Sequence, residues 1–106
     1  MNSLEFYRDA DGAPRARGED LRTLAQFLES DIQDDPETCD ELIAVVAEAD
    51  PELRADYDFV GNSFALSFEA DEVVLLCHAY EDADEVRLRR DTVLSALRDW
   101  KAFIDA

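Results

Sequence analysis

The sequence predicts an α+β protein in which an antiparallel sheet of about 4–5 strands packs against three helices. Apolar residues alternate with polar ones near the start of the chain and again from residue 57 to residue 78, a period typical of strands. Between these regions, and after residue 91, they recur every three or four residues, a period typical of amphipathic helices. We expect the order β-β-α-α-β-β-β-α within a single domain over residues 1–106.

The first predicted unit is a β-hairpin. Residues 4–8 place Leu4 and Phe6 on one face of a strand. Asp11-Gly12 follows, and this dipeptide favours the tight turn of a hairpin. Residues 14–17 form the return strand, and Pro14 predicts a strand start or a sheet edge.

Two helices are expected between residues 18 and 50. In the first, apolar residues at helical spacing end near Gln33. Pro36 suits the first turn of the second helix, and Asp35 is its expected N-cap. We expect Asp50-Pro51 to end this helix and a loop to cover residues 51–54.

Strands are expected to follow this loop. Residues 56–59 alternate in polarity, because Tyr57 and Phe59 alternate with Asp56 and Asp58. Residues 64–68 alternate again after a turn at Gly61-Asn62. Residues 73–78 are apolar on both faces, which predicts a central strand. Residues 86–89 fit either an edge strand or the first turn of the last helix, and both interpretations stay open. Asp91 is the expected N-cap of that helix.

The charge of the chain is strongly negative. Twenty-seven acidic residues against ten basic ones give a formal charge of −17, which opposes binding to nucleic acid. Two explanations stay open: halophilic adaptation to a salt-rich cytoplasm, or a surface that binds a basic partner. No apolar stretch is long enough to span a bilayer, and the N-terminus lacks the features of a secretion signal. We therefore expect a soluble, cytoplasmic protein without a membrane partner.

Several short features resemble the YacL-like family, a group of small cytoplasmic bacterial proteins with no established activity. They are Glu5-Phe6-Tyr7-Arg8-Asp9 with Gly12, the helix end at residues 27–31, Phe64 and Leu66 after Gly61, Val73-Val74, and the terminal helix at residues 97–104. The chain departs from the family after Arg17, where Gly18-Glu19 replaces a longer polar stretch. The resemblance spans nearly the whole chain, and it implies no catalytic residues.

The acidic residues around the junction of the first two helices form the expected partner-binding site. They are Asp31, Asp34, Asp35, Glu37, Asp40 and Glu41. Clustered carboxylates can receive a partner rich in Arg and Lys, or bind a hard cation. The alternative is a solvated junction in which Asp35 caps one helix and its neighbours interact with the helix dipole.

The sequence shows no catalytic constellation, so we expect neither an enzyme nor a cofactor. Cys39 and Cys77 are expected as reduced core residues, and His78 as a strand-end residue with structural hydrogen bonds. The arginines among residues 87–98 are expected to pair with the acids among residues 81–85, although arginine can also grip a phosphate.

The expected function is a non-enzymatic, acidic protein-interaction domain of unknown pathway, whose partner has a basic surface. One alternative is an immunity protein or antitoxin that neutralises a basic nuclease toxin. Another is a carboxylate-based metal-binding protein. The oligomeric state stays open, and a homodimer is compatible with the sequence.

Overall fold

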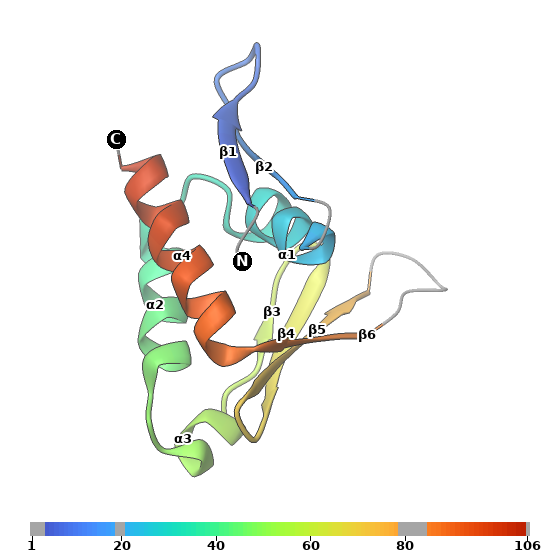
Figure 1. Cartoon of the computed structure of the whole chain (residues 1–106), viewed down its shortest axis with the longest axis vertical. Helices are drawn as coiled ribbons and strands as arrows, with labels where there is room; N and C mark the ends of the chain where they lie inside the picture. The colour runs from blue at the N-terminus through green and yellow to red at the C-terminus, as the bar shows by residue number, and fades with distance from the viewer. Residues whose placement is uncertain (1–3, 19–20, 79–84, 106) are drawn as a thin grey trace.

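The computed structural model of the chain describes residues 4–18, 21–78 and 85–105. A hairpin of β1 (Glu5–Arg8) and β2 (Pro14–Arg17) stands apart from a four-stranded antiparallel sheet (Figure 1). The strands of this sheet lie in the order β3 (Phe59–Val60), β4 (Phe64–Glu69), β5 (Glu72–Cys77) and β6 (Glu85–Arg89). The predicted α+β class is confirmed.

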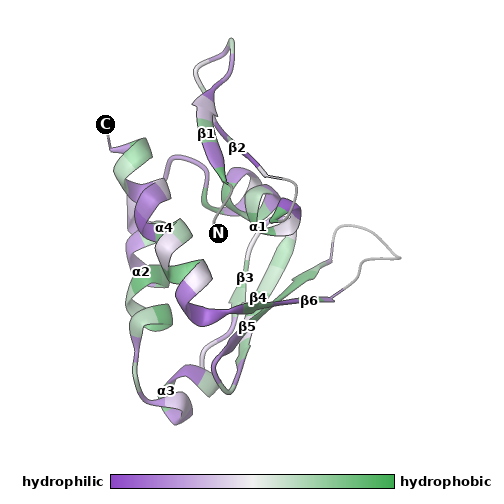
Figure 2. Cartoon of the chain, viewed as in Figure 1, coloured by the Kyte–Doolittle hydropathy of each residue, from purple (hydrophilic) through white to green (hydrophobic). Residues whose placement is uncertain are grey.

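The helices lie between the hairpin and the sheet in sequence and again after the sheet. They are α1 (Arg22–Phe27), the π-helix η1 (Leu28–Ile32), α2 (Pro36–Ala47), α3 (Pro51–Ala55) and α4 (Arg90–Ile104). α2 and α4 run side by side in Figure 1. Figure 2 shows hydrophobic residues concentrated on β4 and β5 and alternating with hydrophilic ones along α2 and α4.

Alternation in β4 buries one face of the sheet. Phe64, Leu66 and Phe68 are buried, and Leu66 pairs with Leu75 of β5. β5 lies between β4 and β6, as predicted for its apolar sequence. Residues 86–89 belong to a strand, which pairs with β5 and continues directly into α4.

Aromatic side chains connect the hairpin to the core. The ring of Phe6 lies 5.1 Å from that of Trp100, in an edge-to-face arrangement, a favourable geometry for aromatic pairs. Trp100 is fully buried, and its indole N–H donates to the carbonyl oxygen of Gln33 at 2.8 Å. Gln33 has a positive φ of 56° and ends η1.

The predicted loop over residues 51–54 is wrong, because these residues form most of α3. α2 already ends at Ala47, and Asp50 caps α3 by accepting from the backbone N–H of Glu52 at 2.9 Å. Asp50-Pro51 thus begins a helix in the way that Asp35-Pro36 does. The same dipeptide also fits the end of a helix, which is why the sequence pattern was misleading.

The predicted N-cap at Asp91 is wrong as well. α4 begins at Arg90, so Asp91 lies within its first turn, and Arg89 occupies the cap position without a side-chain cap hydrogen bond. The Asp91 carboxylate instead lies 3.4 Å from the guanidinium group of Arg89. Because β6 passes into α4 without a loop, the strand end sets the helix start.

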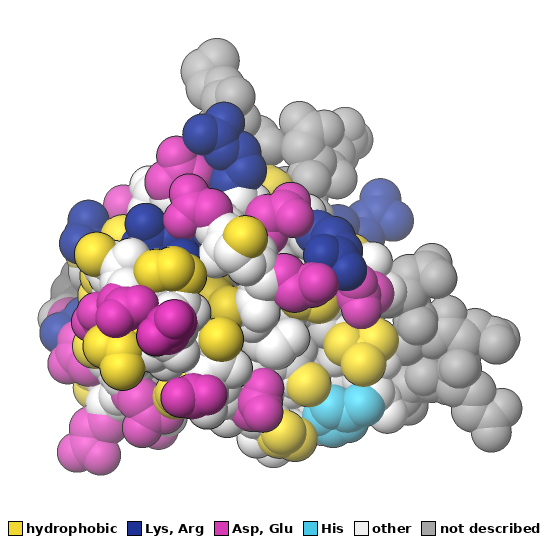
Figure 3. All heavy atoms as spheres, turned by 90° about the horizontal axis from the view of Figure 1, so that it is seen from below, with side chains coloured by type: hydrophobic (Ala, Val, Ile, Leu, Met, Phe, Trp, Pro, Cys, Tyr) yellow, Lys and Arg dark blue, Asp and Glu magenta, His cyan; other side chains and the backbone are white. Residues whose placement is uncertain are grey.

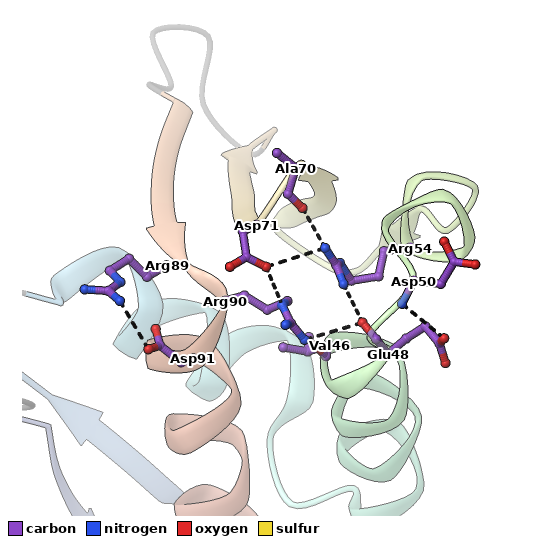
Figure 4. A network of polar contacts seen from close by, with 9 residues as sticks. All are labelled: Val46, Glu48, Asp50, Arg54, Ala70, Asp71, Arg89, Arg90 and Asp91. Atoms are coloured by element: carbon purple, nitrogen blue, oxygen red, sulfur yellow. Dashed lines mark hydrogen bonds and ion pairs between the residues drawn. The ribbon is translucent and has the colours of Figure 1, made fainter.

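A buried arginine joins the end of α2 to the sheet (Figure 4). Arg54 is only 2% exposed. Its guanidinium group donates to the carbonyl oxygen of Glu48, and to that of Ala70 at 2.8 Å. Arg54 therefore holds the segment after α2 against the turn between β4 and β5.

A second arginine completes this network. Arg90 donates to the carbonyl oxygen of Val46 at 2.9 Å and to the carboxylate of Asp71 at 2.9 Å. The same Asp71 oxygen lies 3.6 Å from Arg54. The last carbonyl groups of a helix have no partner within the helix, and the helix dipole favours positive charge beside them. The two arginines therefore meet both requirements at the end of α2.

We predict that Arg54→Leu lowers the free energy of unfolding by about 3 kcal/mol, because the carbonyl group of Ala70 loses its donor and that of Glu48 keeps only a 3.4 Å hydrogen bond from Arg90. Urea denaturation followed by circular dichroism measures the loss. Arg89→Leu is the matched control, since it removes the same charge from a side chain that is 81% exposed. We expect the control to unfold near the wild-type midpoint, and equal losses in the two variants would contradict a structural role for Arg54.

Candidate functional site

The six acidic residues of the predicted partner-binding site lie at the junction of η1 and α2, but they do not share one role. Asp31 is half-buried and holds the turn between β3 and β4. Its carboxylate accepts from the backbone N–H of Ser63 at 3.0 Å and of Phe64 at 2.9 Å. The Ser30 hydroxyl donates to it as well, at 2.8 Å. These bonds occupy the carboxylate and fix the start of β4.

Gly61 lies against the Asp31 carboxylate in this turn. A Cβ atom at Gly61 would meet that carboxylate and would approach the ring of Phe59 to 2.8 Å. Since Asp31 is held by three hydrogen bonds, it cannot move aside at low cost. The glycine that the sequence marks as a turn residue is therefore required by the close approach of an acidic side chain.

Asp35 caps α2, as predicted. Its carboxylate accepts from the backbone N–H groups of Glu37 at 3.1 Å and Thr38 at 3.4 Å, and from the Thr38 hydroxyl at 2.7 Å. These hydrogen bonds, with that from the Thr38 hydroxyl the largest, lower the pKa of Asp35 because they favour its charged form.

Asp40 and Glu41 connect α2 to its neighbours. Asp40 forms an ion pair with Lys101 of α4, and the hydrogen bond between them raises the pKa of Lys101. Glu41 accepts from the Tyr57 hydroxyl at 2.7 Å. Burial raises the pKa of Tyr57, and the bond to Glu41 raises it further.

Asp34 and Glu37 differ from the other four residues. Both side chains are exposed, and neither forms a hydrogen bond or an ion pair with a residue that the structure describes. These two carboxylates thus do not stabilise the fold through contacts with the described residues. They therefore form the part of the predicted site that is open to a partner.

The acidic surface extends well beyond this junction. Residues 23–86 contain nineteen acidic residues and one basic residue, Arg54, which gives this segment a net charge of −18. Arg54 is buried, and among the described carboxylates of this segment it forms an ion pair only with Asp71. In Figure 3 acidic side chains are spread over the whole face, whereas most of the Lys and Arg side chains lie in its upper half, next to acidic ones. The charge segregation is readable from the sequence, but the burial of Arg54 is not.

The thiol and imidazole groups have structural partners. Cys39 is buried and donates to the carbonyl oxygen of Leu97 at 3.3 Å, and burial raises the pKa of its thiol to about 11. His78 is exposed, with its Nε2 atom 3.1 Å from the carbonyl oxygen of Gly61. The predicted structural hydrogen bond of His78 is confirmed.

Three arginines of β6 and α4 pair with acids, only partly with those that the sequence indicated, whereas the predicted pairing of Arg98 is not seen with any described residue. Arg87 pairs with Glu85 at 3.0 Å, as predicted, and also with Glu69. Arg89 and Arg90 pair with Asp91 and Asp71 instead. The remaining predicted partners, Glu81, Asp82 and Asp84, lie outside the described residues.

Two further features are absent from residues 4–18, 21–78 and 85–105. These residues bring together no group of three or more His, Cys, Asp or Glu side chains that could hold a metal ion. None of their helices combines the length and the apolar character needed to cross a membrane.

Comparison with known proteins places the chain in a family. The model of an uncharacterised protein family, UPF0231, matches residues 3–97. The chain belongs to this family. The match confirms the resemblance to the YacL-like family and extends from the hairpin into α4. No curated protein and no solved structure matches the chain. The family description assigns no activity, so the function has to be argued from the surface itself.

We predict a specific acid sensitivity at Asp35. Its folded pKa is lowered, so its charged form stabilises the fold above the ordinary pKa, and this contribution is lost as the pH falls through the folded value. Asp35→Asn keeps a capping oxygen and removes the titrating group. Between about pH 5 and pH 2 we expect the wild-type chain to lose more stability than this variant.

Urea denaturation at a series of pH values measures the difference. Asp34→Asn is the matched control, because it removes one carboxylate that no described residue binds. The control is expected to follow the wild-type profile. If the Asp35→Asn profile also coincides with the wild-type one, the cap does not depend on the charge of Asp35.

Proposed function

We propose that the chain is a non-enzymatic protein-interaction domain, which binds a basic surface of a partner through the acidic surface around Asp34 and Glu37. The observation that supports this proposal is the position of Arg54. It is the one basic residue between positions 23 and 86, and it lies in the interior. The segment therefore has nineteen acidic residues and no exposed basic residue among them.

The proposed surface suits fast, salt-dependent association. A surface of one sign attracts an oppositely charged partner over a distance of about a Debye length, which accelerates encounter. Each exposed ion pair adds little affinity, so recognition depends on several carboxylates acting together. Asp34 and Glu37 can join such pairs without breaking a bond that the fold uses.

The narrower alternative is an immunity protein or antitoxin that neutralises a basic nuclease toxin. The same acidic surface would serve it, since complementary charge favours rapid neutralisation. No feature of the described residues favours a nuclease over other basic partners, so this alternative stays a prediction. The carboxylate-based metal-binding alternative lacks a group of ligands among the described residues. A cytoplasmic location and a homodimer also stay predictions.

The proposal predicts that Asp34→Asn with Glu37→Gln weakens binding to a basic protein. The experiment is a pull-down from the lysate of the source organism at low and high salt, with the retained proteins identified by mass spectrometry. We expect the wild-type chain to retain a basic protein at low salt and to release it at high salt. The double variant should retain about fivefold less of it at low salt.

Asp11→Asn with Asp99→Asn is the matched control, because both residues are exposed and the variant loses the same two charges outside the acidic segment. This control is expected to retain the partner as the wild-type chain does. Equal losses in both double variants would show that only the total charge matters. If no basic protein is retained at either salt concentration, the proposal fails and halophilic adaptation is favoured.

A further inference from the structure

A cavity lined by several basic residues lies between the hairpin and α1, away from the acidic junction. Its volume is about 370 Å³, and its lining includes Arg15 and Arg17 of β2, Arg22 of α1, Tyr7 and Glu29. Three of the ten basic residues of the chain thus line one cavity. This concentration of arginine is notable in a protein with a net charge of −17, because the overall charge works against attracting an anion.

The alternation of β2 places two of these arginines on the same face. Pro14 and Ala16 are buried, so Arg15 and Arg17 project from the opposite side of the strand. Each donates a hydrogen bond to a carboxylate through Nε. Nε of Arg15 donates to Glu29 at 3.2 Å, and Nε of Arg17 donates to Glu5 at 2.9 Å.

Their terminal Nη atoms are available as donors. Nη1 of Arg15 lies 3.9 Å from the Asp9 carboxylate, beyond hydrogen-bond distance, and no Nη atom of Arg15 or Arg17 donates a hydrogen bond to a described residue. The Arg17 guanidinium group also lies over the ring of Tyr7, 5.3 Å from its centre. These contacts restrict the guanidinium groups of Arg15 and Arg17 before a ligand binds, which reduces the conformational entropy lost on binding.

Arg22 and Glu29 complete the cavity in different ways. Arg22 is exposed and forms no hydrogen bond or ion pair with the described residues. Glu29 is engaged by the fold, since its Oε1 atom also accepts from the backbone N–H of Ala16 at 2.7 Å. The described lining residues thus supply three guanidinium groups and one carboxylate, and the carboxylates of Glu5 and Asp9 lie beside Arg17 and Arg15.

We propose that this cavity binds the phosphate group of a small phosphorylated molecule. The N–H donors of a guanidinium group match the oxygens of a phosphate in geometry. A phosphate also offers more oxygens and more negative charge than a carboxylate to three guanidinium groups. The cavity volume falls within the usual range of small-molecule sites. Tyr7, which is 40% exposed, supplies an aromatic wall for the rest of the molecule. This site is independent of the acidic surface, so either can be correct without the other.

The test is a titration of the full ¹⁵N-labelled chain with inorganic phosphate, followed by NMR at constant ionic strength. We expect saturable shifts of the amide signals of residues 15–18 and 22–26, and about tenfold weaker binding for Arg22→Gln. Arg22 makes no bond that the fold uses, so this variant should keep the wild-type spectrum elsewhere. Arg98→Gln, which removes an exposed charge from α4, is the matched control and should bind as the wild-type chain does.

Two further titrations define the ligand. Adenosine monophosphate should bind more tightly than inorganic phosphate if the ligand is a phosphorylated molecule that packs on Tyr7. Acetate at the same ionic strength should not compete. The proposal is overturned if phosphate produces no saturable shift, if Arg22→Gln binds as well as Arg98→Gln, or if acetate binds as well as phosphate.

Discussion

The carbonyl groups at the end of α2 need hydrogen-bond donors, and Arg54 and Arg90 supply them. Buried carbonyl groups without partners are costly, so this requirement is strict. The same guanidinium groups also hold the turn between β4 and β5 through Ala70 and Asp71. Three parts of the chain that are distant in sequence are thereby fixed at one place, where the start of α4 lies beside the end of α2.

This interior use of Arg54 also shapes the exterior. Residues 23–86 include a single basic residue, Arg54, and it lies in the core. The acidic residues therefore dominate the surface of this segment. Yet many of these acids serve the fold. Asp31 fixes a turn, Asp35 and Asp50 cap helices, and Asp40 pairs with Lys101. The number of acidic residues therefore overstates the surface that is open to a partner.

Local rules predicted those elements whose signals lie within a few residues. The hairpin, the alternation of β4 and the cap at Asp35 belong to this group. Features that depend on distant partners were not predictable in this way. The backbone donors to Asp31, at Ser63 and Phe64, lie more than thirty positions along the chain, and Arg54 is buried by contacts with Glu48 and Ala70. The strand at residues 86–89 is likewise decided by its pairing with β5, which the alternation of its own residues does not specify.

The contact of Phe6 with Trp100 has a consequence for synthesis. The ribosome makes the hairpin before α4, so the side chain that covers Phe6 arrives only when residues near position 100 have been added. A lone hairpin is marginally stable, so the nascent chain carries uncovered apolar groups for most of its elongation. Its growing negative charge keeps neighbouring nascent chains apart during that interval.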